Sequence, residues 1–188
     1  MNYLEIVYDR SSKPKTNYVS QYVRFLIRTF DLTANMRILD LGCGQGDITS
    51  EFNLNGFSAI GVDNTSGALT QYPDLEFVDS DITKSLPFPD MSFDVVFSKS
   101  VVEHLESPTH LFNEGHRVLK RGGYLITMTP DWEVQMQKFY DDWTHVRPFT
   151  IVTMTNMYKL AGFTDLNIFY FKQLPFLWGN KPLSMISN

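Results

Sequence analysis

The chain of 188 residues contains very little cysteine and no long apolar run. Cys43 is the only cysteine, so no disulfide can form within the chain, which suits a reducing compartment and predicts a cytoplasmic protein. A stretch of about 18 apolar residues, the length that spans a bilayer, does not occur. The N-terminus also lacks the basic segment and apolar core of a secretion signal. We therefore expect neither membrane insertion nor export.

Runs of lysine or arginine are also missing, and the net charge is −5. A surface that follows the phosphates of a nucleic acid needs such runs, so the composition disfavours a nucleic-acid partner, although folding could still build a local basic patch. No group of histidines and cysteines has the spacing of a zinc site, and no Gly-x-Ser-x-Gly nucleophile elbow occurs. The sequence therefore predicts no metal site.

The strongest positive signal is a glycine-rich turn between an apolar strand and a helix. The strand covers residues 38–41, the glycines are Gly42, Gly44 and Gly46, and the helix starts at about Asp47. Glycine at every second position allows a sharp turn and lets a ligand lie directly against the backbone. The first amides of the helix point into the same space. This stretch is typical of a nucleotide or cofactor site.

An acidic residue, Asp40, stands two positions before the first glycine. A dinucleotide-binding fingerprint needs a third glycine at the position that Asp47 occupies here. A carboxylate aimed at the turn disfavours a pyrophosphate and favours a cation, by about 4 kcal/mol for unit charges at ~4 Å and an effective dielectric of ~20. The ligand is thus expected to carry positive charge near the glycines, and a nicotinamide-dependent oxidoreductase stays only as an alternative.

The pattern Asp-x-Gly-x-Gly-x-Gly of residues 40–46 resembles motif I of the class I methyltransferases that use S-adenosylmethionine. Two further segments, Val-Val-Glu-His-Leu at 101–105 and Arg-Val-Leu-Lys-Arg-Gly-Gly at 117–123, resemble the same family. The resemblance is strong over about residues 36–128 and weaker elsewhere. It implies an α/β fold with a doubly wound, mostly parallel sheet of the Rossmann-like methyltransferase type. It also implies S-adenosylmethionine as cofactor and S-adenosylhomocysteine as product.

Polar residues at predicted strand ends are candidate cofactor ligands. Asp63 closes the segment 58–62, where an ionised carboxylate can accept hydrogen bonds from both ribose hydroxyls. The resemblance places Asp81 against the adenine amino group, Ile82 against the adenine ring and Ser98 at the methionine end. The expected cofactor-binding set is Asp40, Gly42, Gly44, Gly46, Asp63, Asn64, Asp81, Ile82 and Ser98.

The order of apolar segments predicts a parallel sheet with helices on both faces. Strands are expected at 38–41, 58–62, 75–78, 93–98, 124–128 and 166–171. Helices are expected at 17–30, with Asn17 as a possible N-cap, at 47–53, at 65–72, from Pro108 to the pair Gly122–Gly123, and at 148–161. A seventh strand would be shortened or missing, because only 183–186 could supply it.

We expect one methyltransferase domain over residues 1–188. Within it, residues 1–32 form an N-terminal helix or lid, residues 33–130 the cofactor-binding core, and residues 131–188 the acceptor-side segment with the last helix and strand. Tyr18 and Tyr22 are candidates for the lid, with ordinary packing as the alternative.

The segment 132–147 is the predicted wall for the methyl acceptor, because it follows the carboxyl end of the fifth strand. Trp132, Trp143 and Arg147 are candidate substrate-binding residues. Residues 144–150 resemble a phrase found in methyltransferases of small polar or sugar-like acceptors. If the acceptor is a hydroxyl, a histidine general base helps near neutral pH, and the candidates are His145 and His104.

The sequence therefore predicts methyl transfer from S-adenosylmethionine to an oxygen or nitrogen of a small molecule. Three alternatives stay open: a protein or RNA acceptor, a cofactor-binding regulatory protein without turnover, and the nicotinamide-dependent oxidoreductase. The acceptor, the atom methylated, the need for a general base and the oligomeric state are not determined by the sequence.

Overall fold

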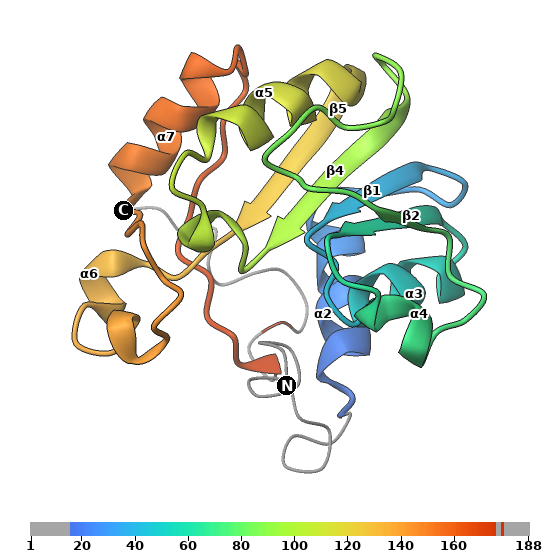
Figure 1. The fold of residues 1–188 in the computed structure, drawn as a ribbon, viewed down its shortest axis with the longest axis horizontal. Coiled ribbons are helices and arrows are strands. Elements are labelled where there is room, and N and C mark those ends of the chain that lie inside the picture. Colours follow the sequence, from blue (N-terminus) through green and yellow to red (C-terminus); the bar gives the residue numbers. More distant parts are fainter. Residues whose placement is uncertain (1–15, 176–177, 179–188) are drawn as a thin grey trace.

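The computed structural model describes residues 16–175 and 178, and it contains a sheet of five parallel strands with helices on both faces (Figure 1). The strands are β1 Arg37–Leu41, β2 Ser58–Asp63, β3 Phe77–Asp79, β4 Phe93–Lys99 and β5 Leu119–Met128. The α-helices are α2 Tyr18–Thr29, α3 Asp47–Leu54, α4 Gly67–Gln71, α5 Thr109–Val118, α6 Trp132–Gln135 and α7 Ile151–Leu160. Two 3-10 helices, η1 Val102–His104 and η2 Phe139–Asp141, follow β4 and α6. The predicted α/β fold class is confirmed.

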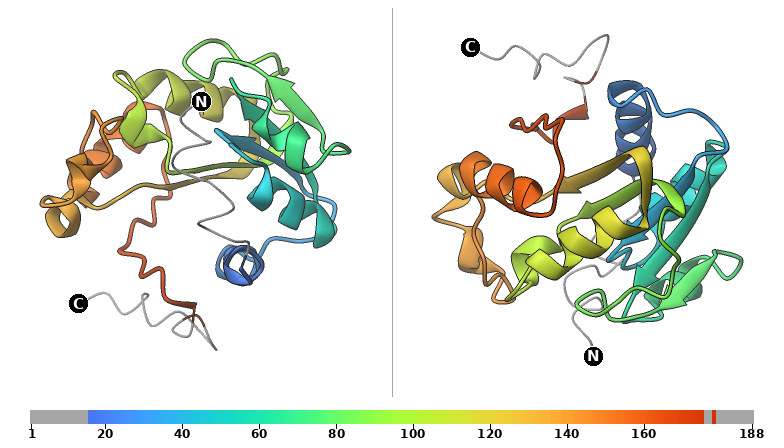
Figure 2. Two further views of the ribbon diagram at one scale, coloured as in Figure 1. Left: turned by 60° about the horizontal axis from the view of Figure 1, so that its bottom comes forward. Right: turned by 90° about the horizontal axis from the view of Figure 1, so that it is seen from above.

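Each face of the sheet carries its own apolar layer, because successive side chains of a strand point to opposite faces. In β1, Ile38 belongs to the layer under α2 and α3, whereas Leu39 belongs to the layer under α5 and α7. Phe52 of α3 and Phe112 of α5 are both fully buried in these layers. Figure 2 shows the sheet between the two sets of helices. Strands buried on both faces explain why their sequences read as apolar runs.

The strand order β3-β2-β1-β4-β5 reverses direction beside β1. Chain connections move outward through β2 and β3 on one side, and through β4 and β5 on the other. The loops after β1 and β4 therefore lead away in opposite directions from the carboxyl edge, which is where open α/β sheets bind ligands. In this chain, these two loops are the glycine turn 42–46 and residues 100–105.

The expected sixth strand at 166–171 is wrong, since these residues form no strand. They line a cavity of about 1180 Å³ that β5 lines from the other side. Their apolar side chains pack against the two core layers: the Phe171 ring lies 5.0 Å from Phe25 and 5.3 Å from Trp178, while Leu166 and Ile168 join the opposite layer. Side-chain packing on both sides holds the segment without a backbone ladder. The sheet of the described residues has five strands, and residues 183–186 lie outside them.

Three boundaries also differ from expectation. Helix α5 ends at Val118, not at the glycine pair, and β5 begins at once with Leu119. Gly123 lies within β5, where a Cβ atom would come within 2.7 Å of the Asp94 carbonyl oxygen, so glycine here allows close approach of two strands rather than ending a helix. Strand β3 begins at Phe77 rather than two residues earlier, and the Asn17 side chain makes no capping hydrogen bond to α2.

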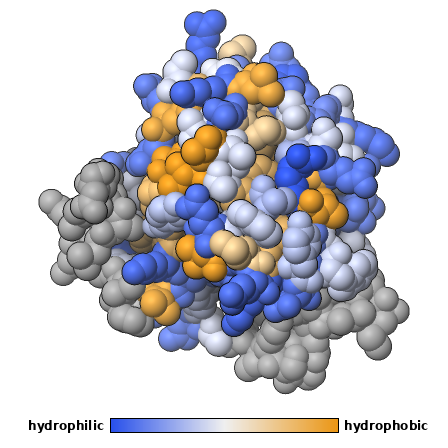
Figure 3. All heavy atoms as spheres, turned by 90° about the vertical axis from the view of Figure 1, so that its left-hand side faces the viewer, coloured by the Kyte–Doolittle hydropathy of each residue, from blue (hydrophilic) through white to orange (hydrophobic). Residues whose placement is uncertain are grey.

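The face drawn in Figure 3 carries apolar side chains exposed among polar ones. In the described part of the chain, no helix has both the length and the apolar character needed to cross a membrane.

The packing of α3 generates a stability prediction. Phe52 is fully buried, with ring contacts to Phe57 at 5.7 Å and Phe97 at 5.9 Å, whereas Leu54 on the same helix is 76% exposed. We expect Phe52→Ala to lower the free energy of unfolding by about 3–5 kcal/mol, because it leaves a cavity between α3 and the sheet. The matched change Leu54→Ala should cost less than about 0.5 kcal/mol. Urea unfolding measures both, and equal losses would contradict the packing described.

Candidate active site

The glycine turn after β1 has left-handed backbone at all three glycines. Their φ angles are +73° at Gly42, +55° at Gly44 and +77° at Gly46. The backbone amides of Gly42 and Cys43 both donate to the carbonyl of Val62, at 2.8 and 3.1 Å, which ties the turn to the end of β2. A Cβ atom at Gly42 would lie 2.4 Å from a Val101 methyl carbon. The turn therefore needs glycine both for its conformation and for its contact with the loop after β4.

Asp40 lies inside the molecule rather than in the open crevice, with 3% of its surface exposed. The Thr49 hydroxyl of α3 donates a hydrogen bond of 2.6 Å to its carboxylate. Burial raises the pKa of Asp40 to about 7; the Thr49 bond opposes this rise, Asp63 adds to it and Lys99 opposes it. An acidic group in this state would be stabilised in its charged form by a cation at the turn.

Asp63, at the end of β2, is fixed by three hydrogen bonds. One carboxylate oxygen accepts from the Gly44 amide at 2.9 Å, and the other accepts from the Thr65 amide at 3.0 Å and the Thr65 hydroxyl at 2.9 Å. The bond to Gly44 links Asp63 to the glycine turn, as a shared binding site requires. Because a carboxylate offers about four acceptor positions, a diol would have to replace the Thr65 hydroxyl.

Three other expected cofactor residues, Asp81, Ile82 and Asn64, are partly or fully exposed. Asp81 is partly exposed, accepts from the amide and hydroxyl of Thr83, and pairs with Lys84 at 3.1 Å. The Thr83 bonds, followed by Lys84, lower the pKa of Asp81 to about 2. Ile82 is half-buried against the layer under α5, and Asn64 is exposed after β2. Asp81 is therefore ionised at neutral pH, with most of its bonds made to its own loop.

At the end of β4, Ser98 is fully buried, and its hydroxyl oxygen has no hydrogen-bond partner. Lys99 follows, and burial lowers its pKa while Glu103 and Asp40 oppose the change. Ser100 then has a φ angle of +55°, which a residue with a side chain adopts only under constraint. Buried charge and a strained backbone where the sheet's strand order reverses are features of functional sites.

The predicted acceptor wall is tied to the loop after β4. The amides of Val146 and Arg147 both donate to the Glu103 carbonyl, at 2.9 and 3.0 Å, and the Arg147 guanidinium donates to the carbonyl of Glu106. Arg147 therefore fastens the loop as well as facing solvent. Trp143 is 78% exposed, whereas Trp132 is partly buried and packs edge-on against Phe139.

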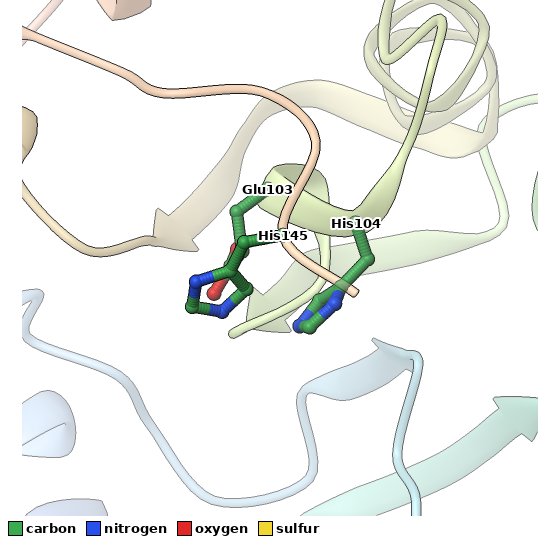
Figure 4. A group of neighbouring side chains, drawn as sticks. All are labelled: Glu103, His104 and His145. Carbon is green, nitrogen blue, oxygen red and sulfur yellow. The ribbon is translucent and has the colours of Figure 1, made fainter. Parts of the chain in front are cut away.

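His104 and His145, 41 residues apart, come together with ring centroids 4.7 Å apart. The His104 Nδ1 lies 2.8 Å from the Thr144 hydroxyl, and the His145 Nδ1 lies 2.6 Å from the carbonyl oxygen of Phe139. The buried carboxylate of Glu103 stands beside them (Figure 4). Burial lowers the pKa of His104, and His145 adds to that effect. The structure thus unites the two candidate general bases in one place.

Two expected lid residues have other surroundings. Tyr22 is 1% exposed and packs against Phe97, Phe171 and Trp178, so it is a core residue rather than a lid. Tyr18 is half-buried, and its hydroxyl donates to the Gln173 side chain at 2.9 Å. Residues 1–15 lie outside the described part of the chain.

Sequence reasoning missed the roles of Glu103, Lys99, Thr49 and Thr144. Glu103 had one available signal, since it interrupts an apolar run and a lone acid in such a run needs a partner. Thr49 also had a signal, because it lies one helical turn inside α3 and faces back toward the strand that precedes the glycines. Thr144 had none, because its contact with His104 bridges 40 residues.

The buried Asp40 generates a pH prediction. Its pKa in the folded protein, about 7, lies above the ordinary 3.8, so the folded state binds the extra proton. This contribution is fully present below pH 3.8 and is lost as the pH rises through about 7. Relative to Asp40→Asn, the wild type should lose stability over this window by at most about 1.4 kcal/mol per pH unit. Urea unfolding across the window tests this, and a constant difference would contradict it.

Comparison with known proteins supports the assignment of the glycine turn. A family model described as "Methyltransferase domain" matches residues 39–127. The biotin biosynthesis bifunctional protein BioHC of Cellvibrio japonicus is 30% identical over 172 residues, which is 82% of this chain and 34% of that protein. A probable S-adenosylmethionine-dependent methyltransferase of Mycobacterium tuberculosis is 29% identical over 69% of this chain and 49% of its own. The chain thus spans a third to a half of the length of these curated relatives.

Among solved structures, a SAM-dependent methyltransferase from Archaeoglobus fulgidus superposes with a TM-score of 0.78 at 25% identity, covering 91% of this chain and 79% of that one. The matched family segment contains the last three residues of β1, the glycine turn, Asp63 and Glu103. Residues 39–127 thus form a methyltransferase domain of the kind found in the class I methyltransferases that depend on S-adenosylmethionine.

Proposed function

We propose that the protein transfers a methyl group from S-adenosylmethionine to an oxygen or nitrogen atom of a small molecule, of the polar or sugar-like kind, in the cytoplasm. One observation carries the proposal: Gly42 of the cofactor turn packs directly on Val101, two residues before Glu103 and three before His104. The turn and the loop that carries His104 are therefore in contact at the carboxyl edge of the sheet. The net charge of −5 favours a small acceptor over a nucleic acid.

The residues present fit the cofactor. The glycine turn offers backbone without side chains, Asp63 offers a carboxylate for a diol, and the unpartnered Ser98 hydroxyl and buried Asp40 lie at the ends of β4 and β1. The bound cofactor supplies a methyl group on a positively charged sulfur. The chain's own tasks are to bind, to orient the acceptor in line with the bond that breaks, and to exclude water.

A proton must leave the acceptor during the reaction. The acceptor's lone pair forms a bond to the methyl carbon, the carbon–sulfur bond breaks with its electrons remaining on sulfur, and the acceptor's proton goes to a base. In His145, Nδ1 lies 2.6 Å from the Phe139 carbonyl, which can only accept, so Nδ1 carries the hydrogen and Nε2 keeps its lone pair. We assign His145 the general base, with the His104 ring packed edge-on beside it.

Cofactor binding tests the first half of the proposal. Calorimetric titration should give one site each for S-adenosylmethionine and S-adenosylhomocysteine. Asp63→Asn should weaken both by about 10- to 100-fold, the value of charge-assisted hydrogen bonds to a diol. Asp74→Asn is the matched control, because Asp74 is exposed in the turn before β3, at the opposite edge of the sheet. Folded protein that binds neither compound would end the proposal.

Transfer of label from S-[methyl-³H]adenosylmethionine tests the second half. Against a panel of small hydroxyl and amine acceptors, including sugars, we expect turnover in wild type and a loss of about 100-fold or more in His145→Gln. Cofactor affinity should be unchanged in this variant, and His116→Gln, exposed on α5, should retain full turnover. Binding without transfer to any acceptor would favour a regulatory protein, and transfer only to RNA or protein would favour a macromolecular acceptor.

A further inference from the structure

We propose that Glu103, His104 and His145 form a binding site for one divalent transition-metal ion. One ligand atom from each residue, a carboxylate oxygen and two ring nitrogens, lies within 4.8 Å of the other two. Figure 4 shows the carboxylate and both rings gathered at one point, with two residues from the loop after β4 and one from the loop before α7. No spacing in the sequence indicates this group, because 41 residues separate the two histidines.

The carboxylate of Glu103 is held in place inside the protein and is not a surface group. The residue is fully buried, and its Oε2 accepts from the Thr129 hydroxyl at 3.0 Å. Its Oε1 is buried without a hydrogen-bond partner. A buried carboxylate oxygen without a partner costs free energy unless something else satisfies it. A metal ion between Glu103 and the two rings would do so.

The hydrogen bonds around the two rings select the tautomer that binds metal. The Phe139 carbonyl can only accept, so the His145 Nδ1 donates to it. The Thr144 hydroxyl donates to Asp142 at 2.6 Å, so it accepts from the His104 Nδ1 at 2.8 Å. Each neutral ring therefore keeps a lone pair on Nε2. Bonds of this kind, from the other ring nitrogen to a carbonyl or a carboxylate-linked hydroxyl, orient histidine ligands in metal sites.

The donor set indicates the class of metal. Two imidazole nitrogens and one carboxylate oxygen suit first-row divalent ions such as Mn²⁺, Fe²⁺, Co²⁺ or Zn²⁺ and leave coordination positions open, whereas Mg²⁺ and Ca²⁺ prefer oxygen ligands. Glu103 and Asp142 place two carboxylates around the site, the latter 3.8 Å from the His145 Nε2, and Lys99 is the cation that faces Glu103. A dication is therefore compatible with the local charge.

A catalytic role for the metal rests on the proposed methyl transfer, whereas metal binding itself does not. An acceptor hydroxyl on an open coordination position would lose its proton more easily, because a metal ion lowers the pKa of a bound oxygen acid. With a metal bound, His104 and His145 would serve as ligands and the acceptor's proton would pass to solvent water; without the metal, His145 would be the base, as proposed above. Metal binding itself needs neither cofactor nor acceptor, so the two proposals fail separately.

Cobalt titration of the chelator-treated, tag-free protein tests the site directly. We expect saturable one-to-one binding with visible absorption of a nitrogen- and oxygen-ligated Co²⁺, and competition by Zn²⁺ but not by Mg²⁺. Glu103→Gln and His145→Gln should each weaken binding at least about tenfold, and Asp142→Asn, which loosens the His104 tautomer, by about 10- to 100-fold. His116→Gln, which removes a histidine elsewhere on the surface, should bind Co²⁺ as wild type does.

Circular dichroism and thermal unfolding establish that each variant is folded. If Glu103→Gln does not fold, His104→Gln takes its place. Wild-type protein that binds no Co²⁺, Mn²⁺ or Zn²⁺ would overturn the proposal, as would binding that His116→Gln lowers as much as His145→Gln does. Wild-type S-adenosylmethionine affinity, measured on the same sample, separates loss of the metal site from loss of the proposed function.

Discussion

The contact between Gly42 and Val101 is the constraint on which the arrangement of the candidate active site depends. Strands β1 and β4 pair in parallel, with Ile38 opposite Val95 and Asp40 opposite Phe97, so their loops emerge side by side at the carboxyl edge. A Cβ atom at Gly42 would lie 2.4 Å from a Val101 methyl carbon. Any side chain there would separate the cofactor turn from the loop that carries Glu103 and His104. Because Gly42 has no Cβ atom, the glycine turn can lie in contact with the loop after β4.

Glu103 then connects that loop to the acceptor side. Its carbonyl accepts from two successive amides of the acceptor wall, and its carboxylate lies within 4.8 Å of a ring nitrogen of each histidine. Asp40 and Glu103 are buried here and Lys99 is partly buried, although charged groups are costly in a protein interior. The attraction of Lys99 to each of the two acids offsets part of that cost. Charged groups in such surroundings are a sign of a functional site.

Much of the fold could be predicted because it follows local patterns. Apolar runs bounded by turns gave β1, β2 and β4 within a residue, and alternation with helices gave the parallel sheet. The failures arose where the same local pattern is compatible with two tertiary outcomes. Residues 166–171 have the composition of a strand, but Phe171 packs on α2 while Leu166 and Ile168 pack on the opposite layer. The pair Gly122–Gly123 can end a helix, but here both residues lie within β5, and Gly123 allows β5 to approach β4.

The sequence by itself determined the family, the glycine turn, and Asp63 at the end of β2, because these features depend on backbone conformation and short spacings along the chain. Only the tertiary structure decided that Tyr22 packs on Phe97 and Phe171, and that His104 and His145 meet beside Glu103. The physical reason is distance along the chain. Contacts between residues some 40 positions apart depend on how β4, β5 and the loop before α7 are placed relative to one another. Local sequence patterns do not predict this placement.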